Sequence, residues 1–393
     1  MYSLLIAVIY LAFIGLGLPD SLLGSAWPKM ITELDSPLSY AGIVSTIIAL
    51  GTIVSSLLSD RLTLKLGAGK VTLISVGITA AALFGFSLST SFVWLCVLAV
   101  PYGLGAGAVD AALNNYVALH YSSRYMSWLH CFWGVGATVG PYIMGYAISA
   151  DKGWRFGYAS VACIQAIIVA FLFFSLPLWK NRRAEEKGVE EAPIGIKDAL
   201  KIKGVKPILL AFFAYCGAET TAGLWASSYL VIGKGVSVEI AAGFASLFYL
   251  GITAGRFIIG FFADRVGDKN MIRLGTAVMA LGLALVLSPM DNNEFALAGL
   301  TVIGFGAAPV YPAIIHATPK NFGKENSHAI VGIQMASAYC GSVIAPPLFG
   351  IIAQKIGMGL YPYYLVLFVL LMFVMTECVN KTCTKQPKHK PLL

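Results

Sequence analysis

Long apolar stretches recur along the whole chain of 393 residues. A helix of about 20 apolar residues is long enough to cross the hydrocarbon core of a bilayer. Hydrophobic residues make up 58% of the chain and charged residues only 12%, against about 25% charged in soluble domains. The sequence therefore predicts an all-α membrane protein. Twelve stretches are recognisable, centred on residues 5–28, 39–59, 70–90, 93–119, 127–150, 157–179, 207–232, 239–263, 272–289, 294–317, 327–353 and 360–379.

Basic residues are unevenly distributed between the connecting segments. Cytoplasmic loops of membrane proteins carry an excess of Lys and Arg near the helix ends. With the N-terminus inside, 21 of the 27 basic residues fall in inner segments, 5 in outer segments and Arg256 within a helix. We therefore expect a multi-pass protein of the cell membrane with both termini in the cytoplasm. The basic residues near the inner helix ends account for the formal charge of +8. No nucleic-acid partner is therefore expected.

Motifs of other protein classes are missing from the sequence. The N-terminus has no basic segment followed by a cleavage site, so residues 5–28 are expected to be a retained helix. The seven cysteines and five histidines lack metal-ligand spacing, and neither His-Glu-x-x-His, Gly-x-Ser-x-Gly nor a P-loop occurs. We expect no metal, no cofactor, no ATP-driven pumping and no enzymatic activity.

One long hydrophilic segment, residues 180–206, divides the twelve stretches into six and six. We expect an N-terminal six-helix bundle at 1–179, a cytoplasmic linker at 180–206, a C-terminal six-helix bundle at 207–380 and a cytoplasmic tail at 381–393.

The two halves repeat one another. Four motifs recur in the same order at offsets of about 200 residues, which indicates two parallel repeats of six helices. The pairs are Asp20 with Glu219, Asp60-Arg61 with Asp264-Arg265, GLGAGAVD (103–110) with GFGAAPVY (304–311), and VGPYIMG (139–145) with APPLFG (345–350).

This arrangement resembles the major facilitator superfamily of transporters, and the resemblance covers nearly the whole chain. The family signature is an Asp-Arg pair at a helix end, followed by Gly and further basic residues. It is blurred in SSLLSDR at 55–61 and clearer in GFFADR at 260–265. The resemblance implies two pseudo-symmetric bundles of six helices, in which Asp60, Arg61, Asp264 and Arg265 connect neighbouring helices at the cytoplasmic face.

Within that superfamily the chain is similar to the fucose permease branch, which contains sugar–proton symporters and sodium-linked relatives. The similarity rests on Asp20, on Asp110 followed by Asn114, and on the segment GAETTAGLWASSYL at 217–230. Asp110 stands where the permease pattern prefers Glu, and Asn115 stands where it prefers Pro. The resemblance implies a transported small molecule and a coupling ion.

Three acidic residues, Asp20, Asp110 and Glu219, lie inside predicted spans. A charged side chain at bilayer depth costs about 2.5–3.5 kcal/mol, so these acids are expected to face a polar cavity. Since a low-dielectric site favours the protonated form of a carboxyl group, they are candidates for proton coupling. The alternatives are packing for Asp110, gating or packing for Asp20, and pairing of Glu219 with a helix-end amide or with Arg256. For Arg256 we favour a side chain that extends along its helix toward Asp264.

Polar and aromatic residues of the spans could bind a solute. Sugar sites combine aromatic faces with amides and carboxylates that satisfy the hydroxyl groups. Helix periodicity puts Asp110 and Asn114 on one face with Gly103 and Gly107, which allow another helix to approach. Each aromatic could instead serve packing, and His130 could simply connect helices. The candidate substrate-binding residues are Asn114, Asn115, His130, Trp133, Trp225, Tyr249, Tyr311 and Gln334.

The sequence as a whole predicts a monomeric secondary active transporter in the lipid bilayer. It would move a small polar solute, with a monosaccharide as the leading candidate, together with a proton by alternating access. Sodium is the alternative coupling ion. The rival functions are proton-coupled export of drugs or metabolites on the same fold and, in principle, a channel.

Overall fold

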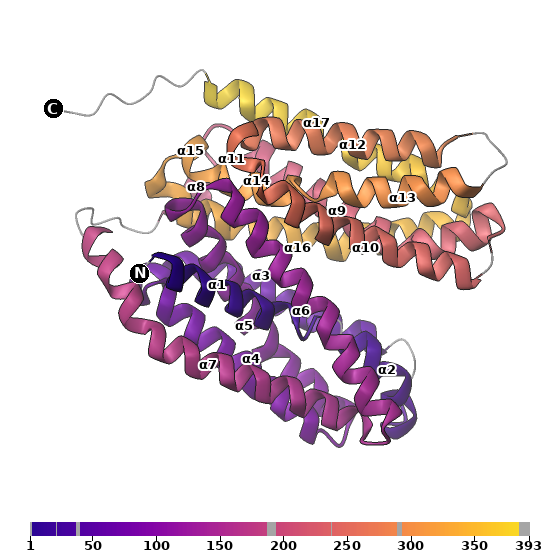
Figure 1. Cartoon of the computed structure of the whole chain (residues 1–393), viewed down its shortest axis with the longest axis horizontal. Helices are drawn as coiled ribbons and strands as arrows, with labels where there is room; N and C mark the ends of the chain where they lie inside the picture. The colour runs from indigo at the N-terminus through magenta and orange to yellow at the C-terminus, as the bar shows by residue number, and fades with distance from the viewer. Residues whose placement is uncertain are drawn as a thin grey trace. The chain divides into compact units, whose positions relative to one another are not determined.

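The computed structural model describes residues 2–20, 22–36, 40–186, 194–236, 238–288 and 293–384, and their regular structure is helical (Figure 1). A π-helical turn covers Tyr229–Gly233, and a 3-10 turn covers Met358–Leu360. The α-helices are α1 (Tyr2–Gly17), α2 (Leu22–Glu33), α3 (Tyr40–Leu66), α4 (Ala68–Leu88), α5 (Phe92–His120), α6 (Ser123–Ser149), α7 (Gly153–Glu186), α8 (Ile196–Ala199), α9 (Val205–Ser228), α10 (Val238–Gly260), α11 (Ala263–Val266), α12 (Asp268–Val286), α13 (Asn293–Ala307), α14 (Val310–His316), α15 (Thr318–Phe322), α16 (Lys324–Lys355) and α17 (Tyr361–Thr384).

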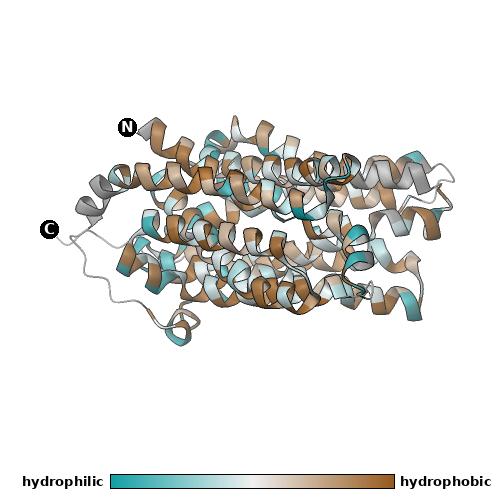
Figure 2. Ribbon diagram, turned by 90° about the horizontal axis from the view of Figure 1, so that it is seen from below, coloured by the Kyte–Doolittle hydropathy of each residue, from teal (hydrophilic) through white to brown (hydrophobic). Residues whose placement is uncertain are grey.

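Ten helices in the described part of the chain are long and apolar enough to cross a membrane. They match ten of the twelve predicted stretches. The predicted stretch 127–150 is α6, which is less apolar because it contains several glycines, serines and aromatic residues. The stretch 239–263 is α10, of which Leu247–Gly260 forms a shorter apolar helix. Figure 2 shows hydrophobic residues along the long helices, and large apolar side chains such as Phe173 and Phe174 are exposed. Such a surface suits contact with lipid.

The chain forms two compact units. The first unit comprises Met1–His120 and Trp128–Pro193, and the second comprises Tyr121–Ser127 and Ile194–Leu393. Helix α6 therefore begins in the second unit and continues in the first. Residues 187–193 of the predicted linker and 385–393 of the predicted tail lie outside the described residues.

Glycines allow close helix contacts in the first unit. A Cβ atom built on Gly103 in α5 would lie 2.2 Å from the carbonyl oxygen of Ile48 in α3, and one on Gly107 would lie 2.1 Å from that of Thr52. No side chain fits in that space, since real Cβ contacts are never so short. The expectation that Gly103 and Gly107 admit a neighbouring helix is confirmed, because both lie against the backbone of α3.

The second unit repeats this packing. A Cβ atom on Gly304 in α13 would lie 2.2 Å from the carbonyl oxygen of Phe248 in α10. Gly304 follows Gly103 by 201 residues and Phe248 follows Ile48 by 200. A Cβ atom on Gly136 in α6 would lie 2.2 Å from the carbonyl oxygen of Ile14 in α1. In the second unit, a Cβ atom on Gly341 in α16 would lie 2.2 Å from the carbonyl oxygen of Phe213 in α9. The repeat predicted from the motifs is therefore also a repeat of helix contacts.

Replacing Gly103 by alanine should destabilise the first unit. The added methyl group has no room beside Ile48, and overpacking of this kind costs about 1–3 kcal/mol. Gly77 in α4 is the matched control, because a Cβ there meets nothing within 4 Å and alanine is the better helix former. We expect Gly103→Ala to lower the thermal unfolding midpoint of the purified protein and Gly77→Ala to keep or raise it. Equal midpoints for the two variants would contradict this packing.

Candidate functional site

Asp110 and Asn114 form the centre of a buried hydrogen-bond chain in α5. Asp110 is 5% exposed and Asn114 is fully buried. The Asn114 Nδ2 group donates to the Asp110 carboxyl Oδ1 over 2.8 Å and to the Asp110 backbone oxygen over 3.0 Å. The one-turn spacing predicted from the sequence thus produces a direct contact. Neither side chain is turned outward to lipid.

His130 extends this chain to a second helix. Its Nε2 atom lies 3.0 Å from Asn114 Oδ1. Because an amide oxygen only accepts hydrogen bonds, His130 Nε2 is the donor of this contact. The ring is 5% exposed and lies edge-on to Phe13 of α1, with 5.6 Å between centroids. The amide of Asn114 therefore connects the imidazole of α6 to the carboxyl group of α5.

Trp133 lies one turn further along α6 and contacts the other predicted acid of this unit. Its indole Nε1 donates to Asp20 Oδ2 over 2.9 Å. Asp20 is exposed and belongs to the turn between α1 and α2, where Pro19 has no N–H group to continue a helix. The end of α1 lies against α6, because a Cβ on Gly17 would be only 2.1 Å from the Trp133 carbonyl oxygen.

One face of α6 therefore connects both acids of the first unit. His130 and Trp133, three residues apart, point to the same side of a helix. Through them α6 is hydrogen-bonded to Asn114 and Asp110 of α5 and to Asp20 after α1. A cluster of two carboxyl groups, an amide, an imidazole and an indole can hold a proton and bind hydroxyl groups. The name "acid cluster" is used below for Asp20, Asp110, Asn114, His130 and Trp133.

For the transport expected from the sequence, removing the indole donor of Trp133 should weaken solute uptake without unfolding the protein. Trp133→Phe keeps an aromatic ring, although a smaller one, and leaves Asp20 without this N–H. A hydrogen bond to a charged group contributes about 1.5–3 kcal/mol, which corresponds to a loss of about tenfold or more in substrate uptake at low concentration. Trp179→Phe is the matched control, since Trp179 in α7 donates to the Ser175 hydroxyl and, among the described residues, to no acid. Equal uptake by the two variants would exclude a role for the Asp20 contact.

The second unit contains a buried ion pair. Arg256 Nη2 of α10 lies 3.3 Å from Glu219 Oε1 of α9, and the side chains are 4% and 17% exposed. The favoured prediction for Arg256, extension toward Asp264, is wrong, and the alternative pairing with Glu219 is the one present. A charged arginine inside an apolar helix is stabilised more by a carboxylate of the adjacent helix than by Asp264, which lies beyond the end of its own helix. The sequence shows two opposite intramembrane charges in consecutive helices, which permits this pairing but does not select it over extension toward Asp264.

The remaining substrate-binding candidates are Asn115 of the first unit and four residues of the second unit. Asn115 is buried in α5. Trp225 Nε1 donates to the Pro346 carbonyl over 3.0 Å, and the Tyr311 hydroxyl lies 3.2 Å from Met335 sulfur. Tyr249 is half exposed and lies against Gly223, one turn after Glu219.

Gln334 is fully buried in α16. Its Oε1 accepts from the Thr318 hydroxyl over 2.9 Å, and its Nε2 has no partner among the described residues. No sequence motif indicates Thr318 as the partner of Gln334.

The predicted signature residues occupy helix ends. Asp60 is buried in the last two turns of α3, whereas Arg61 and Arg265 are exposed. Asp264 accepts hydrogen bonds from the Ser122 hydroxyl and the Arg124 backbone N–H, both over 2.9 Å, and from the Arg124 guanidinium. Burial opposes ionisation of Asp264, but these hydrogen bonds together lower the pKa of its carboxyl group below the ordinary value.

Sequence reasoning did not identify the partners of this acid. Arg124 is one of the 21 basic residues of the inner segments, and its position alone does not indicate a partner. The neighbouring Ser123 hydroxyl donates to Asp268 over 2.7 Å. His316 Nδ1 lies 2.8 Å from Asp268 Oδ2, and its Nε2 lies 3.0 Å from the Tyr121 carbonyl oxygen. These are contacts within the second unit, to which Tyr121–Ser127 belong. No motif in the sequence indicates them.

A family model described as Major Facilitator Superfamily matches residues 9–252 and 241–389. The chain therefore belongs to the Major Facilitator Superfamily. It is a multi-pass membrane protein and a secondary transporter rather than an enzyme.

Individual relatives agree with this class. The chain is 24% identical over 409 residues to "Bypass of stop codon protein 6" of Saccharomyces cerevisiae, covering 96% of this chain and 81% of that protein. It is 22% identical over 351 residues to the glucose/mannose transporter GlcP of Bacillus subtilis, covering 87% and 86%. The crystal structure of the transporter FucP in the outward conformation matches with a TM-score of 0.79 and 17% identity, over 95% of this chain and 98% of that one. The last likeness confirms the predicted fold of two pseudo-symmetric six-helix bundles.

Proposed function

We propose that this transporter moves a small polar solute, with a monosaccharide as the leading candidate, together with a proton by alternating access. The observation that carries the proposal is the acid cluster. It combines carboxyl groups that can take up a proton with amide, imidazole and indole groups that can hydrogen-bond solute hydroxyls.

Asp110 is the proposed proton carrier. It is buried in a spanning helix, where desolvation disfavours a lasting negative charge and favours exchange of a proton. Its hydrogen bond from Asn114 couples its charge to the orientation of the amide and, through Asn114 Oδ1, to His130. Protonation of Asp110 therefore changes the hydrogen-bonding pattern presented to a solute.

Asp20 and Trp133 are the proposed substrate contacts of the first unit. Asp20 is exposed, so its carboxylate is free to accept from solute hydroxyl groups beside its bond from Trp133. The indole of Trp133 offers an apolar face of the kind that covers the C–H face of a sugar ring. In the second unit, we assign Glu219 to the ion pair with Arg256 across α9 and α10.

Two relatives support a sugar as substrate. GlcP is named as a glucose/mannose transporter, and FucP of E. coli is named as a fucose:proton symporter. Asn114, which is hydrogen-bonded to Asp110, and Asn115, which is buried in the same helix, favour a hydroxylated solute over an amphipathic drug. The second candidate function is proton-coupled export of drugs or metabolites, which the same acids would serve.

The proposal includes the orientation and organisation predicted from the sequence. We place both termini in the cytoplasm, the two bundles at 1–179 and 207–380, the linker at 180–206 and the tail at 381–393. The excess of basic residues in the inner segments supports this orientation.

Uptake assays test the proposal. Purified protein in proteoliposomes with an acidic exterior is given a panel of labelled monosaccharides, and dye extrusion is measured in parallel. We expect at least one sugar to accumulate only when the pH gradient is present, and to raise the unfolding midpoint of the detergent-purified protein, since binding to the native state alone stabilises it. Extrusion of dyes with no sugar uptake would favour the exporter, and accumulation driven by sodium alone would replace the proton.

A further inference from the structure

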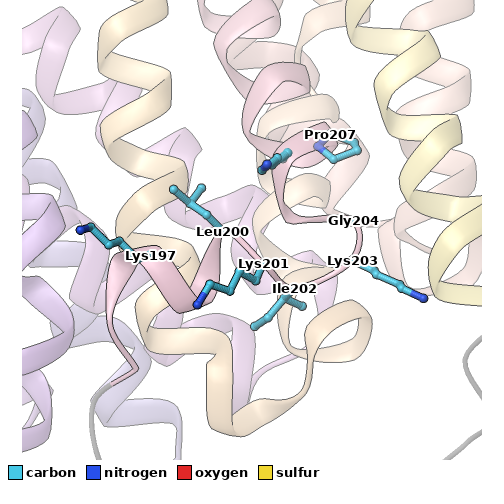
Figure 3. Close-up of a pocket in the computed structure, with 8 residues that line it drawn as sticks. Lys197, Leu200, Lys201, Ile202, Lys203, Gly204 and Pro207 are labelled. Carbon is cyan, nitrogen blue, oxygen red and sulfur yellow. The ribbon is translucent and has the colours of Figure 1, made fainter.

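A group of lysines surrounds the start of α9, in a part of the second unit that the transport proposal does not use. Figure 3 shows this region, a surface hollow of about 520 Å³. Its lining residues are Lys197, Leu200, Lys201, Ile202, Lys203, Gly204, Lys206 and Pro207. The name "lysine turn" is used below for residues 197–207.

The lysine turn is strongly basic. It contains four lysines, all exposed, and a single acid, Asp198. Of these lysines, only Lys201 has an ion-pair partner among the described residues, Asp198 over 2.7 Å, and these two side chains are 77% and 62% exposed. Exposed pairs of this kind contribute little and are screened by salt. The turn therefore presents an excess of positive charge that the described part of the protein does not neutralise.

The lysine turn lies next to a membrane-spanning segment. The apolar span of α9 begins at Val205, directly after Lys203 and Gly204. Ile196 is exposed, and Leu200 and Ile202 are half-buried between the lysines. Apolar side chains interspersed with lysines are typical of segments that lie in the lipid headgroup region. At this position the lysine stems can lie along the apolar boundary while their ammonium groups reach the headgroups.

The lysines spread around the turn rather than converge on one point. In Figure 3, Lys197 and Lys203 extend in opposite directions, and Lys201, which follows α8, extends between them. A single phosphate would need ammonium groups directed toward a common centre. Ammonium groups that point outward along a surface suit many separate anions instead, as in a layer of lipid headgroups.

We propose that the lysine turn binds the anionic phosphate headgroups of the lipid leaflet at the start of α9. With the proposed orientation this is the cytoplasmic leaflet, which carries a negative surface potential that attracts basic segments next to spanning helices. The interaction anchors the segment between α8 and α9 to the membrane surface. It is independent of the identity of the transported solute.

Lipid binding by the full-length protein tests this inference. Native mass spectrometry from detergent micelles measures the dissociation constants of phosphatidylglycerol and phosphatidylcholine. The test variant replaces the four lysines of the turn by glutamine. The matched control replaces four exposed lysines of other segments by glutamine, and so has the same change in charge. The control positions are Lys65, Lys70, Lys269 and Lys320.

We expect phosphatidylglycerol to bind the test variant about tenfold or more weakly than the wild type, and the control variant to stay close to the wild type. Phosphatidylcholine should bind all three equally. Unchanged phosphatidylglycerol binding in the test variant would overturn the proposal, as would an equal loss in the control. Displacement of phosphatidylglycerol by millimolar inorganic phosphate would overturn the assignment to lipid in favour of a soluble phosphate.

Discussion

Asp110→Asn should abolish proton-driven accumulation while the protein still equilibrates its solute across the membrane. Asparagine has nearly the same shape, so it can remain hydrogen-bonded to Asn114, but it cannot take up and release a proton. A gradient of one pH unit corresponds to about 1.4 kcal/mol and supports about tenfold accumulation when one proton accompanies each solute. In proteoliposomes with such a gradient, we expect about tenfold accumulation by the wild type and an inside concentration equal to the outside one for Asp110→Asn.

Asp151→Asn is the control for this experiment. Asp151 is an exposed aspartate of the same unit in a left-handed backbone conformation, φ 53°, which asparagine also tolerates. It should accumulate solute like the wild type. If Asp110→Asn still accumulated the solute tenfold, Asp110 would not carry the proton. Equilibration by the variant shows that it is folded and inserted.

Breaking the Glu219–Arg256 pair should destabilise the second unit strongly. Arg256→Met removes the cation and leaves Glu219 beside α10 without its charged partner. Removal of one member of a buried pair costs about 3–5 kcal/mol, because the remaining charge stays in a low-dielectric site. Replacing both residues by apolar ones, as in Glu219→Leu with Arg256→Met, should restore much of the loss. Denaturant unfolding of the purified variants measures these differences as a double-mutant cycle.

An exposed pair of the same unit is the matched control for the cycle. Lys201→Met breaks the contact of Lys201 with Asp198, whose side chains are mostly exposed. Its effect should stay within about 0.5 kcal/mol. A loss after Arg256→Met as small as that after Lys201→Met would mean that the Glu219 contact does not stabilise the unit.

The helices and their repeat were predictable because they depend on local composition. Hydrophobic length decides where a chain can cross the bilayer, and each of the twelve predicted stretches corresponds to a helix or a pair of consecutive helices. The first stretch is interrupted at Leu18–Asp20, between α1 and α2, because Pro19 cannot continue the backbone hydrogen bonds. The sequence contained that proline, but apolar length alone did not reveal the break.

The membership of the acid cluster was partly predictable. The spacing of Asp110 and Asn114, and that of His130 and Trp133, follows from helix periodicity. Which residue pairs with which depends on the rotation of α5 and α6 about their axes and on the approach of Gly17 to α6. A single sequence does not specify these rotations. The position of Asn114 between Asp110 and His130 therefore depends on the tertiary structure and cannot be predicted from helix periodicity alone.

Long-range charge pairing was the least predictable feature. Arg256 could extend along its own helix or across to the next, and only the arrangement of α9 and α10 decides for Glu219. Asp264 likewise has a partner 140 residues away, Arg124. Such partners leave no periodic pattern in the sequence, since each depends on the packing of helices that are distant along the chain.

Solute-driven proton movement tests the central claim most directly. An accumulated monosaccharide is added to the outside of proteoliposomes in weakly buffered medium without sodium, and the external pH is recorded as the sugar enters. The account predicts a rise in external pH for the wild type and for Asp151→Asn, and none for Asp110→Asn. Sugar entry with no pH change in the wild type, or an unchanged pH rise in Asp110→Asn, would contradict coupling through the acid cluster.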